Sequence, residues 1–184
     1  MLDDPDSLPE RIAVSNRCVL AMRELPIPTI AKVGGVAAGS GANLALACDF
    51  VVAAEEGYFA QLFVHRGLSV DSGASWLLPR LVGERRAREL CLLGDRIDAP
   101  SALEAGLITQ VAADPDRAVA DLAGRLRDLS PAALAGTKRM LNRTWQVTFA
   151  EALEAEAANQ VRVITSPEAH AAISAFGRRP TPGA

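Results

Sequence analysis

Hydrophobic residues along the chain follow two kinds of spacing, and the two kinds predict different elements. Short runs rich in apolar residues predict buried strands at residues 29–33, 50–54, 58–61 and 107–111. Apolar residues at helical spacing predict helices at residues 10–25, 42–48, 71–82, 85–93 and 98–106, with Pro79 bending or ending the third. This alternation of strands and helices predicts an α/β architecture.

From Asp116 onward the pattern becomes entirely helical. Ser-Pro pairs at residues 130–131 and 166–167 have the form of an N-cap followed by proline in the first turn, and Thr148 with Glu151 forms a capping-box pattern. The sequence therefore predicts an α/β core over residues 1–112 and a helical region over residues 113–184. The helical region has apolar faces of its own, which pack either on the chain's own core or on a partner subunit.

One glycine-rich stretch, GGVAAGSGANLALACDF at residues 34–50, joins a predicted strand to a predicted helix. Glycine is costly in ordered backbone unless the chain needs a positive φ or a close approach. Unpaired N–H groups at a helix start can bind an anion, which is the functional interpretation of this loop. A tight turn without any ligand is the alternative. The spacing does not fit the dinucleotide-binding fingerprint, because Leu44 occupies its third glycine position.

Composition and charge narrow the class of protein. Nineteen basic and 22 acidic residues give a net charge of −3 without a basic face, which argues against a nucleic-acid partner. No apolar run is long enough to span a membrane and no signal-peptide pattern is visible, so we expect no membrane partner and a cytoplasmic location. Cys18, Cys48 and Cys91 are expected to be small buried thiols. His65 and His170 lack ligand-spaced partners, so no metal is expected.

Two longer stretches carry a specific resemblance. PTIAKVGGVAAGSGANLALACDFVVAA and GYFAQLFVHRGLSVDSGASWLLPRLVGERRARELCLLGDRIDAPSALEAGLITQV together resemble the enoyl-CoA hydratase/isomerase (crotonase) family over about residues 28–111, and more weakly to residue 176. The details look most like the epoxyphenylacetyl-CoA isomerase branch and its enoyl-CoA isomerase relatives. The resemblance implies a crotonase-like α/β spiral of ββα units with a C-terminal helical oligomerisation region.

The resemblance also identifies the anion as the enolate oxygen of an acyl-CoA thioester. Two backbone N–H groups, an oxyanion hole, hold its charge in this family, and one of the two positions matches Ser40. Gly39 and Gly41 are the positions that let the backbone approach the thioester. Coenzyme A arrives as part of the substrate, so the resemblance implies no separate cofactor.

Departures from the family pattern decide the expected reaction. Hydratases of the family add water with two glutamates, and the matching positions are Asn43 and Phe63, neither of which can take a proton from water. The isomerase branch carries a carboxylate where this chain has Asp71, which is therefore the candidate acid/base. The alternative role of Asp71 is an N-cap for a helix beginning at Ser72, and both roles can hold together. We expect an acyl-CoA isomerase of fatty-acid or aromatic-acid catabolism.

Family members carry about eighty further residues before the position that matches Met1, and that segment supplies the second oxyanion N–H and much of the CoA-binding surface. We therefore expect the fold to be incomplete at its N-terminus. The alternatives are a non-catalytic remnant acting as an oligomeric scaffold, or a hydratase without its usual glutamates. The resemblance further implies a homotrimer or hexamer, with Arg178 and Arg179 near a position that contacts the CoA of a neighbouring subunit.

Overall fold

The computed structural model describes residues 5–176, which divide into two compact units between Gly124 and Arg125. The boundary lies in the last turn of helix α5 (Pro115–Arg127), whereas the sequence pattern changes at residue 112, where strand β6 ends. The first unit contains the glycine-rich loop and every predicted site residue up to Asp71.

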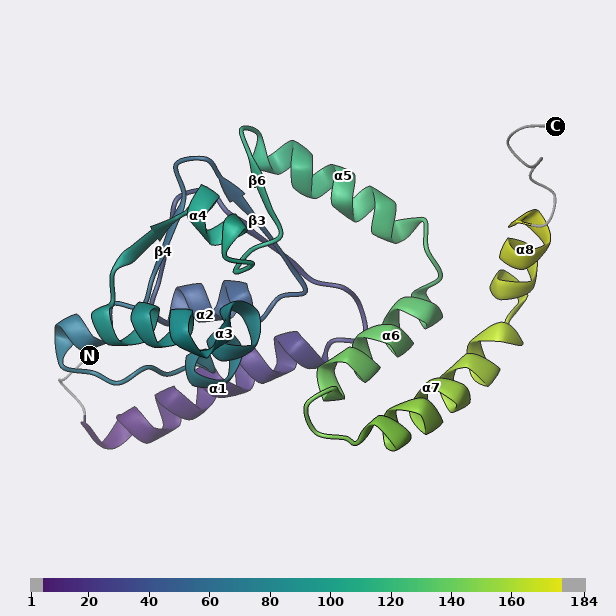
Figure 1. The fold of residues 1–184 in the computed structure, drawn as a ribbon, viewed down its shortest axis with the longest axis horizontal. Coiled ribbons are helices and arrows are strands. Elements are labelled where there is room, and N and C mark those ends of the chain that lie inside the picture. The colour runs from purple at the N-terminus through teal and green to yellow at the C-terminus, as the bar shows by residue number, and fades with distance from the viewer. Residues whose placement is uncertain (1–4, 177–184) are drawn as a thin grey trace. The chain divides into compact units, whose positions relative to one another are not determined.

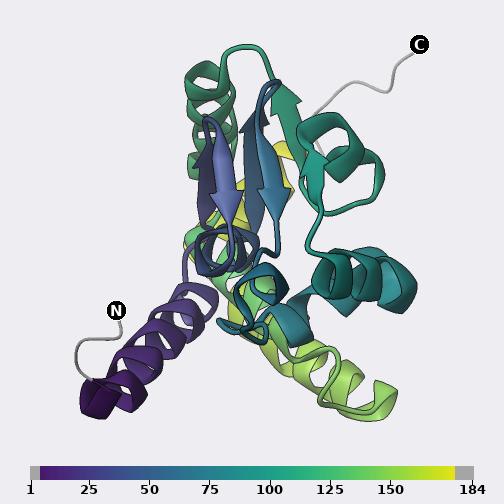
Figure 2. The same cartoon turned by 90° about the vertical axis from the view of Figure 1, so that its left-hand side faces the viewer.

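Six short strands in the first unit form two sheets of three (Figures 1 and 2). In one sheet the order is β1-β3-β6 and all neighbours are parallel; in the other the order is β2-β4-β5, with β2 and β4 parallel and β4 and β5 antiparallel. The strands are β1 (Ile30–Val33), β2 (Val36–Ala38), β3 (Phe50–Ala54), β4 (Tyr58–Ala60), β5 (Arg96–Asp98) and β6 (Gln110–Ala112). The sequence pattern predicted β1, β3 and β4 closely, placed β6 too early, and missed β2 and β5.

Consecutive strands pass from one sheet to the other through tight turns. Strand β1 lies in the first sheet and β2 in the second, and β3 and β4 repeat the arrangement. The second turn brings backbones so close that a Cβ on Gly57 would lie 2.9 Å from the Ala54 carbonyl oxygen. The amide and hydroxyl of Thr29 both donate to the Asp49 carboxylate, at 2.7 and 2.9 Å, which fixes the starts of β1 and β3 relative to each other.

Helices α2 and α4 of the first unit pack against the strands. Helix α2 packs against β1, β2, β3 and α3, and its buried residues Ala42 and Leu46 join the main core with Val51, Phe59 and Leu78. The helices are α1 (Leu8–Glu24), α2 (Ser40–Leu46), α3 (Ala74–Leu93), α4 (Ala99–Glu104) and α5, with short 3₁₀ turns η1 (Pro5–Ser7) and η2 (Val64–Arg66).

Helix α3 is interrupted, but not where the sequence predicted. The helix continues through Pro79, and the break lies at Gly83, whose φ of 76° and ψ of 162° are not helical. Glycine reaches this conformation without the steric cost that a side chain would add. Pro79 therefore does not end this helix, and the two predicted segments form one helix that is interrupted at Gly83.

The second unit consists of helices among its described residues. They are α6 (Pro131–Arg143), α7 (Phe149–Ile164) and α8 (Pro167–Phe176). The predicted caps are confirmed: the hydroxyls of Ser130 and Ser166 accept from the amides of Ala133 and Ala169, and Thr148 forms a complete capping box with Glu151. These side chains satisfy N–H groups that have no partner inside their helices.

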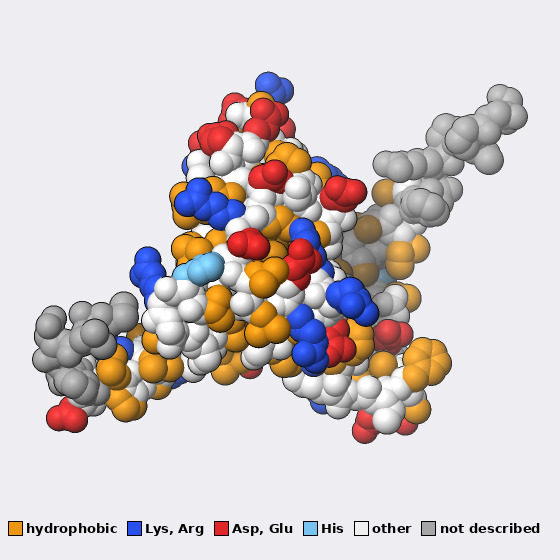
Figure 3. All heavy atoms as spheres, turned by 60° about the vertical axis from the view of Figure 1, so that its left-hand side comes forward, with side chains coloured by type: hydrophobic (Ala, Val, Ile, Leu, Met, Phe, Trp, Pro, Cys, Tyr) orange, Lys and Arg blue, Asp and Glu red, His pale blue; other side chains and the backbone are white. Residues whose placement is uncertain are grey.

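One face of the molecule carries side chains of both signs. Acidic and basic side chains are mixed with hydrophobic ones over the face shown in Figure 3. Among residues 5–176, no helix combines the length and apolarity needed to cross a membrane. The thiol prediction needs one correction, because Cys18 is exposed on α1, whereas Cys48 and Cys91 are half-buried.

Candidate active site

The glycine-rich loop ends at Gly39, which is the N-cap of α2. Its φ of 55° and ψ of −130° lie in a region that side-chain-bearing residues rarely adopt, and this conformation turns the chain from β2 into the helix. The Gly39 amide donates to the Ala60 carbonyl at 2.9 Å, so the loop is fixed to the end of β4. Ser40 is the first residue of α2, and its N–H has no intrahelical carbonyl to pair with.

Asp71 lies in the loop that precedes α3. The next two residues have positive φ, 50° at Ser72 and 87° at Gly73, and Gly73 is the N-cap of α3. Asp71 provides no side-chain cap, and the helix begins at Ala74 rather than at Ser72. The alternative role of Asp71 as an N-cap is therefore wrong. Buried Ser72 instead meets Ser15 of α1, with 3.2 Å between the two hydroxyl oxygens.

The structure brings Ser40 and Asp71 together. The Ser40 hydroxyl donates to Oδ1 of Asp71 at 2.8 Å, and the Asp71 side chain is exposed. A single residue of α2 thus carries the predicted oxyanion N–H and also holds the predicted acid/base. An exposed carboxylate beside a free helix-start N–H is an arrangement that can move a proton next to a developing negative charge.

Asn43 is completely buried one turn further along α2. Its Nδ2 donates to the main-chain carbonyl of Asp71 at 3.0 Å, and its Oδ1 accepts from Nε2 of Gln61 at 2.8 Å. Gln61 follows β4 and is 3% exposed. The sequence analysis named Asn43 and missed Gln61, whose only signal was an amide at the end of an apolar strand.

Phe63 and Gly41 differ in their surroundings. The buried Phe63 ring packs over Gly39, 3.5 Å from the position that a Cβ there would occupy. Gly41 is exposed, and a Cβ built on it would meet no atom within 4 Å. The loop therefore has an apolar wall on one side and open space at Gly41. The predicted contacts at Arg178 and Arg179 lie outside the described residues.

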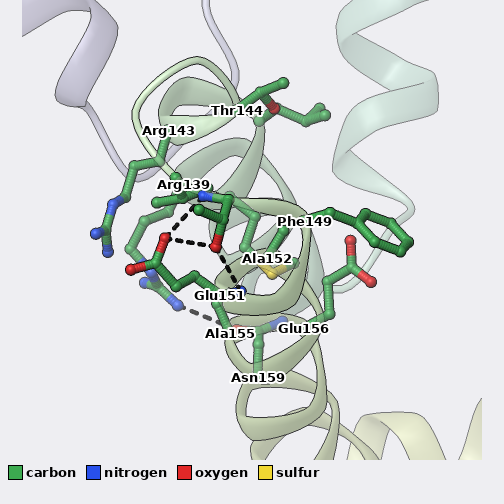
Figure 4. Close-up of a pocket in the computed structure, with 13 residues that line it drawn as sticks. Arg139, Arg143, Thr144, Phe149, Glu151, Ala152, Ala155, Glu156 and Asn159 are labelled. Carbon is green, nitrogen blue, oxygen red and sulfur yellow. Dashed lines mark hydrogen bonds between the residues drawn. The ribbon is translucent and has the colours of Figure 1, made fainter.

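Other candidate groups lie elsewhere. Within the described chain, no three His, Cys, Asp or Glu side chains are grouped so that they could hold a metal ion. A cleft of about 470 Å³ lies in the second unit between α6 and α7, where Arg139, Phe149, Glu151 and Asn159 line it (Figure 4). Its lining residues do not include any predicted catalytic residue.

Comparisons with known proteins identify the family. The enoyl-CoA hydratase/isomerase family model matches residues 14–182. The chain belongs to the enoyl-CoA hydratase/isomerase family. It is 46% identical over 111 residues to the 1,2-epoxyphenylacetyl-CoA isomerase of Escherichia coli, covering 60% of this chain and 42% of that protein. It is 32% identical over 148 residues to a trans-2-decenoyl-[acyl-carrier-protein] isomerase of Streptococcus mutans, covering 80% and 56%. The alignments thus span roughly half the length of these two relatives.

Solved structures show the same fold. An enoyl-CoA hydratase from Polaromonas sp. JS666 is 36% identical with a TM-score of 0.92, and the match covers 96% of this chain and 70% of that one. A relative from Thermobifida fusca YX, solved in complex with acetoacetyl-CoA, is 32% identical with a TM-score of 0.81, covering 86% and 63%. The predicted crotonase-like α/β fold is confirmed.

Proposed function

We propose that this protein isomerises an unsaturated or epoxidised acyl-CoA through an enolate, in fatty-acid or aromatic-acid catabolism. The observation that carries the proposal is the hydrogen bond from Ser40 to Asp71 at the start of α2. The names of two relatives, an epoxyphenylacetyl-CoA isomerase and a decenoyl-[acyl-carrier-protein] isomerase, support this substrate class. Coenzyme A would come with the substrate.

For an unsaturated substrate, the proposed reaction moves one proton. Asp71 takes a proton from a carbon of the acyl chain, and the electron pair shifts toward the thioester oxygen, which becomes an enolate. The Ser40 N–H donates to that oxygen, and one such donor is commonly worth about 10²–10³-fold in rate. Asp71 then returns the proton to a different carbon as the double bond moves. The net reaction consumes no water and transfers no electrons to another molecule.

Hydration is less well supported because the side chains available do not suit it. At the positions that match the family's two glutamates, the Asn43 side chain already makes two hydrogen bonds and Phe63 carries an apolar ring. Neither residue can act as a base toward water. The nearby carboxylate is Asp71, which suits a proton shuttle within one substrate.

The test is an isotope assay with a 3-enoyl-CoA and a 2-enoyl-CoA of the same length. Isomerisation moves the double bond and adds no oxygen, and in D₂O it incorporates deuterium only as far as the Asp71 carboxyl exchanges with solvent before it returns the proton, whereas hydration in H₂¹⁸O adds labelled oxygen. We expect a shifted double bond and no labelled oxygen. Labelled oxygen in the product would favour a hydratase, and a folded protein that binds acyl-CoA without either reaction would favour the non-catalytic scaffold.

The assay is run on two forms of the protein. One is the 184-residue chain, and the other is the same chain preceded by the segment that the resemblance places before Met1, taken from the Polaromonas relative. We expect the second form to bind short acyl-CoA more tightly, because the resemblance assigns the second oxyanion N–H to that segment. Micromolar binding and full turnover by the first form would contradict this expectation. Calorimetric titration measures the binding.

A further inference from the structure

Two buried amides form a chain of hydrogen bonds beneath Asp71. The side chain of Gln61 donates to that of Asn43, which in turn donates to the Asp71 carbonyl. Asn43 is 0% exposed and Gln61 is 3% exposed. The chain of bonds connects three segments of the first unit: the end of β4, helix α2 and the loop before α3.

The Asp71 carbonyl is the last acceptor, and its identity fixes the direction of both hydrogen bonds. A main-chain carbonyl accepts hydrogen bonds and cannot donate them, so Asn43 must present its NH₂ group to Asp71. Its carbonyl oxygen must then face Gln61, which must present its own NH₂ group. The remaining Gln61 oxygen, Oε1, is buried and has no hydrogen-bond partner among the described residues.

The unpartnered Oε1 raises the question of why residue 61 carries an amide and not an apolar side chain. Leaving a buried acceptor unsatisfied is unfavourable, so an apolar side chain at this position would be the cheaper choice for stability alone. What an apolar side chain cannot supply is the donor that holds the Asn43 amide in its orientation. The unfavourable free energy of the unsatisfied Oε1 is therefore explained if the Gln61 amide orients Asn43, and Asn43 in turn orients the main chain at Asp71.

We infer that Asn43 and Gln61 are positioning residues for Asp71. Helix α2 holds Asp71 at two points: the Ser40 hydroxyl holds the carboxylate, and the Asn43 amide holds the main-chain carbonyl. Ser40 and Asn43 are three residues apart, which places them on the same side of the helix. The oxyanion N–H of Ser40 and the carboxylate of Asp71 are thereby held by one rigid element. This inference rests on the proposed function.

A consequence concerns the position that matches the first hydratase glutamate. Replacing Asn43 by glutamate removes the NH₂ group and places a carboxylate against the Asp71 carbonyl. The substitution therefore disturbs the loop before α3 and does not create a hydratase from this chain. The same argument predicts that Asn43→Asp, which is almost the same size, loses the Asp71 anchor while it keeps an acceptor for Gln61.

The direct experiment is a double-mutant cycle between Asn43→Asp and Asp71→Asn, measured as kcat and KM with the 3-enoyl-CoA in the form of the protein that turns over. We expect Asn43→Asp to lower kcat by about 10–100-fold with little change in KM, since a misplaced catalytic group commonly costs about 10²-fold. In the Asp71→Asn background the same substitution should lower kcat by less than about twofold. Equal losses in both backgrounds would overturn the inference.

Two controls separate positioning from loss of stability. Val52→Ala removes buried volume in β3 at a residue outside the hydrogen bonds among Ser40, Asn43, Gln61 and Asp71, and we expect it to lower the melting temperature while kcat stays unchanged. Gln61→Leu should lower kcat, by less than Asn43→Asp, without a comparable fall in melting temperature. A kcat loss in Val52→Ala as large as that in Asn43→Asp would show that stability alone accounts for the effect.

A measurement on the folded chain needs no activity. Side-chain amide resonances of Asn43 and Gln61 should exchange slowly with solvent, and Asn43→Asp should speed the exchange of the Ala74 amide, which donates to the same Asp71 carbonyl. Rapid exchange of both side chains in the unaltered protein would overturn the inference. If Asp71→Asn leaves turnover intact, the proposed function fails. If the side-chain amides exchange slowly but Asn43→Asp lowers kcat equally in both backgrounds, only the positioning role fails.

Discussion

The hydroxyl of Ser40 donates a 2.8 Å hydrogen bond to the carboxylate of Asp71, from a helix start to a loop 31 residues later in the chain. The bond brings the two residues that are predicted to be catalytic into direct contact. Under the proposed function it also limits where the substrate can lie, because the thioester oxygen would reach the Ser40 N–H while the acyl carbons lie beside Asp71.

Replacing Asp71 by Asn tests the proton carrier. Asn retains an oxygen that can accept from Ser40 but cannot take a proton, so we expect turnover to fall about 10²–10⁴-fold, the range for a positioned acid/base. The folding stability should change little, because Asp71 is exposed and does not cap α3. Kinetics and thermal melts measure the two effects. Unchanged turnover would mean that another group carries the proton.

Replacing Ser40 by Ala removes the hydroxyl and keeps the main-chain N–H. We expect a turnover loss of about tenfold, smaller than that of Asp71→Asn, because the carboxylate remains but loses one anchor. The variant should retain its affinity for acyl-CoA. A loss in Ser40→Ala that persists undiminished in the Asp71→Asn background would show that the hydroxyl acts on substrate directly.

Gly39→Ala and Gly41→Ala form a matched pair in one loop. Gly39 has a φ of 55° and Gly41 lies inside α2 with open space around it. Alanine at residue 39 should destabilise the fold by about 1–3 kcal/mol, whereas alanine at residue 41 should be neutral or stabilise it by up to about 1 kcal/mol. Urea unfolding measures both.

Activity separates the two glycine variants further. If the thioester passes over residue 41, Gly41→Ala will weaken acyl-CoA binding in a protein that is as stable as the original. Unchanged binding by that variant would place the thioester elsewhere. Gly39→Ala is compared at a temperature where it remains folded, so that lost binding is not confused with unfolding.

The assembly state is predicted to be a trimer or hexamer. Several apolar side chains of α6 and α7 are exposed in the single chain, including Leu141 at 66%, Phe149 at 79% and Leu153 at 49%. Exposed apolar groups of this size favour association. Light scattering should report a trimer or hexamer at micromolar concentration, and the pair Phe149→Ser and Leu153→Ser should shift the mass toward a monomer. A monomer in the unaltered protein would contradict the prediction.

The capping box of α7 should make its stability depend on pH. The Thr148 amide and then its hydroxyl donate to Glu151, which lowers the pKa of that carboxyl below its ordinary value of 4.5. A lowered folded-state pKa contributes stability that is present above about pH 4.5 and is lost as the pH falls through the folded value. Thr148→Ala should therefore lower the melting temperature at pH 7, and the difference should shrink toward pH 3. Thr137→Ala, at an exposed position inside α6, is the control and should show no such dependence.

Strong local signals predicted most of the fold. The strand at β3 and the caps at Ser130 and Thr148 follow from apolar runs and capping residues that act over a few positions. Strand β2 was missed because it lies inside the glycine-rich stretch that was interpreted as a loop, and β5 was missed because it contains only one apolar side chain, Ile97. Pairing with β4 stabilises both strands, and that pairing is not visible in a local pattern.

The site was predictable in part for a similar reason. The resemblance pointed to Ser40, Asn43 and Asp71, and the structure brings the three together, while their catalytic roles stay predictions. Their mutual hydrogen bonds were not predictable, because they join residues about thirty positions apart. Gln61 was missed because its importance depends on a partner on another element.

The register between β2 and β4 has a consequence for how this site can change. Ala38 pairs with Ala60 in parallel strands, so the glycine loop and the segment from Gln61 to Phe63 leave the same edge of the sheet side by side. Backbone pairing therefore places residue 63 beside Gly39 whatever side chain it carries. Exchanging residue 63 would allow one scaffold to acquire or lose a water-activating group without rebuilding the proposed anion site, while the Gln61 amide is kept.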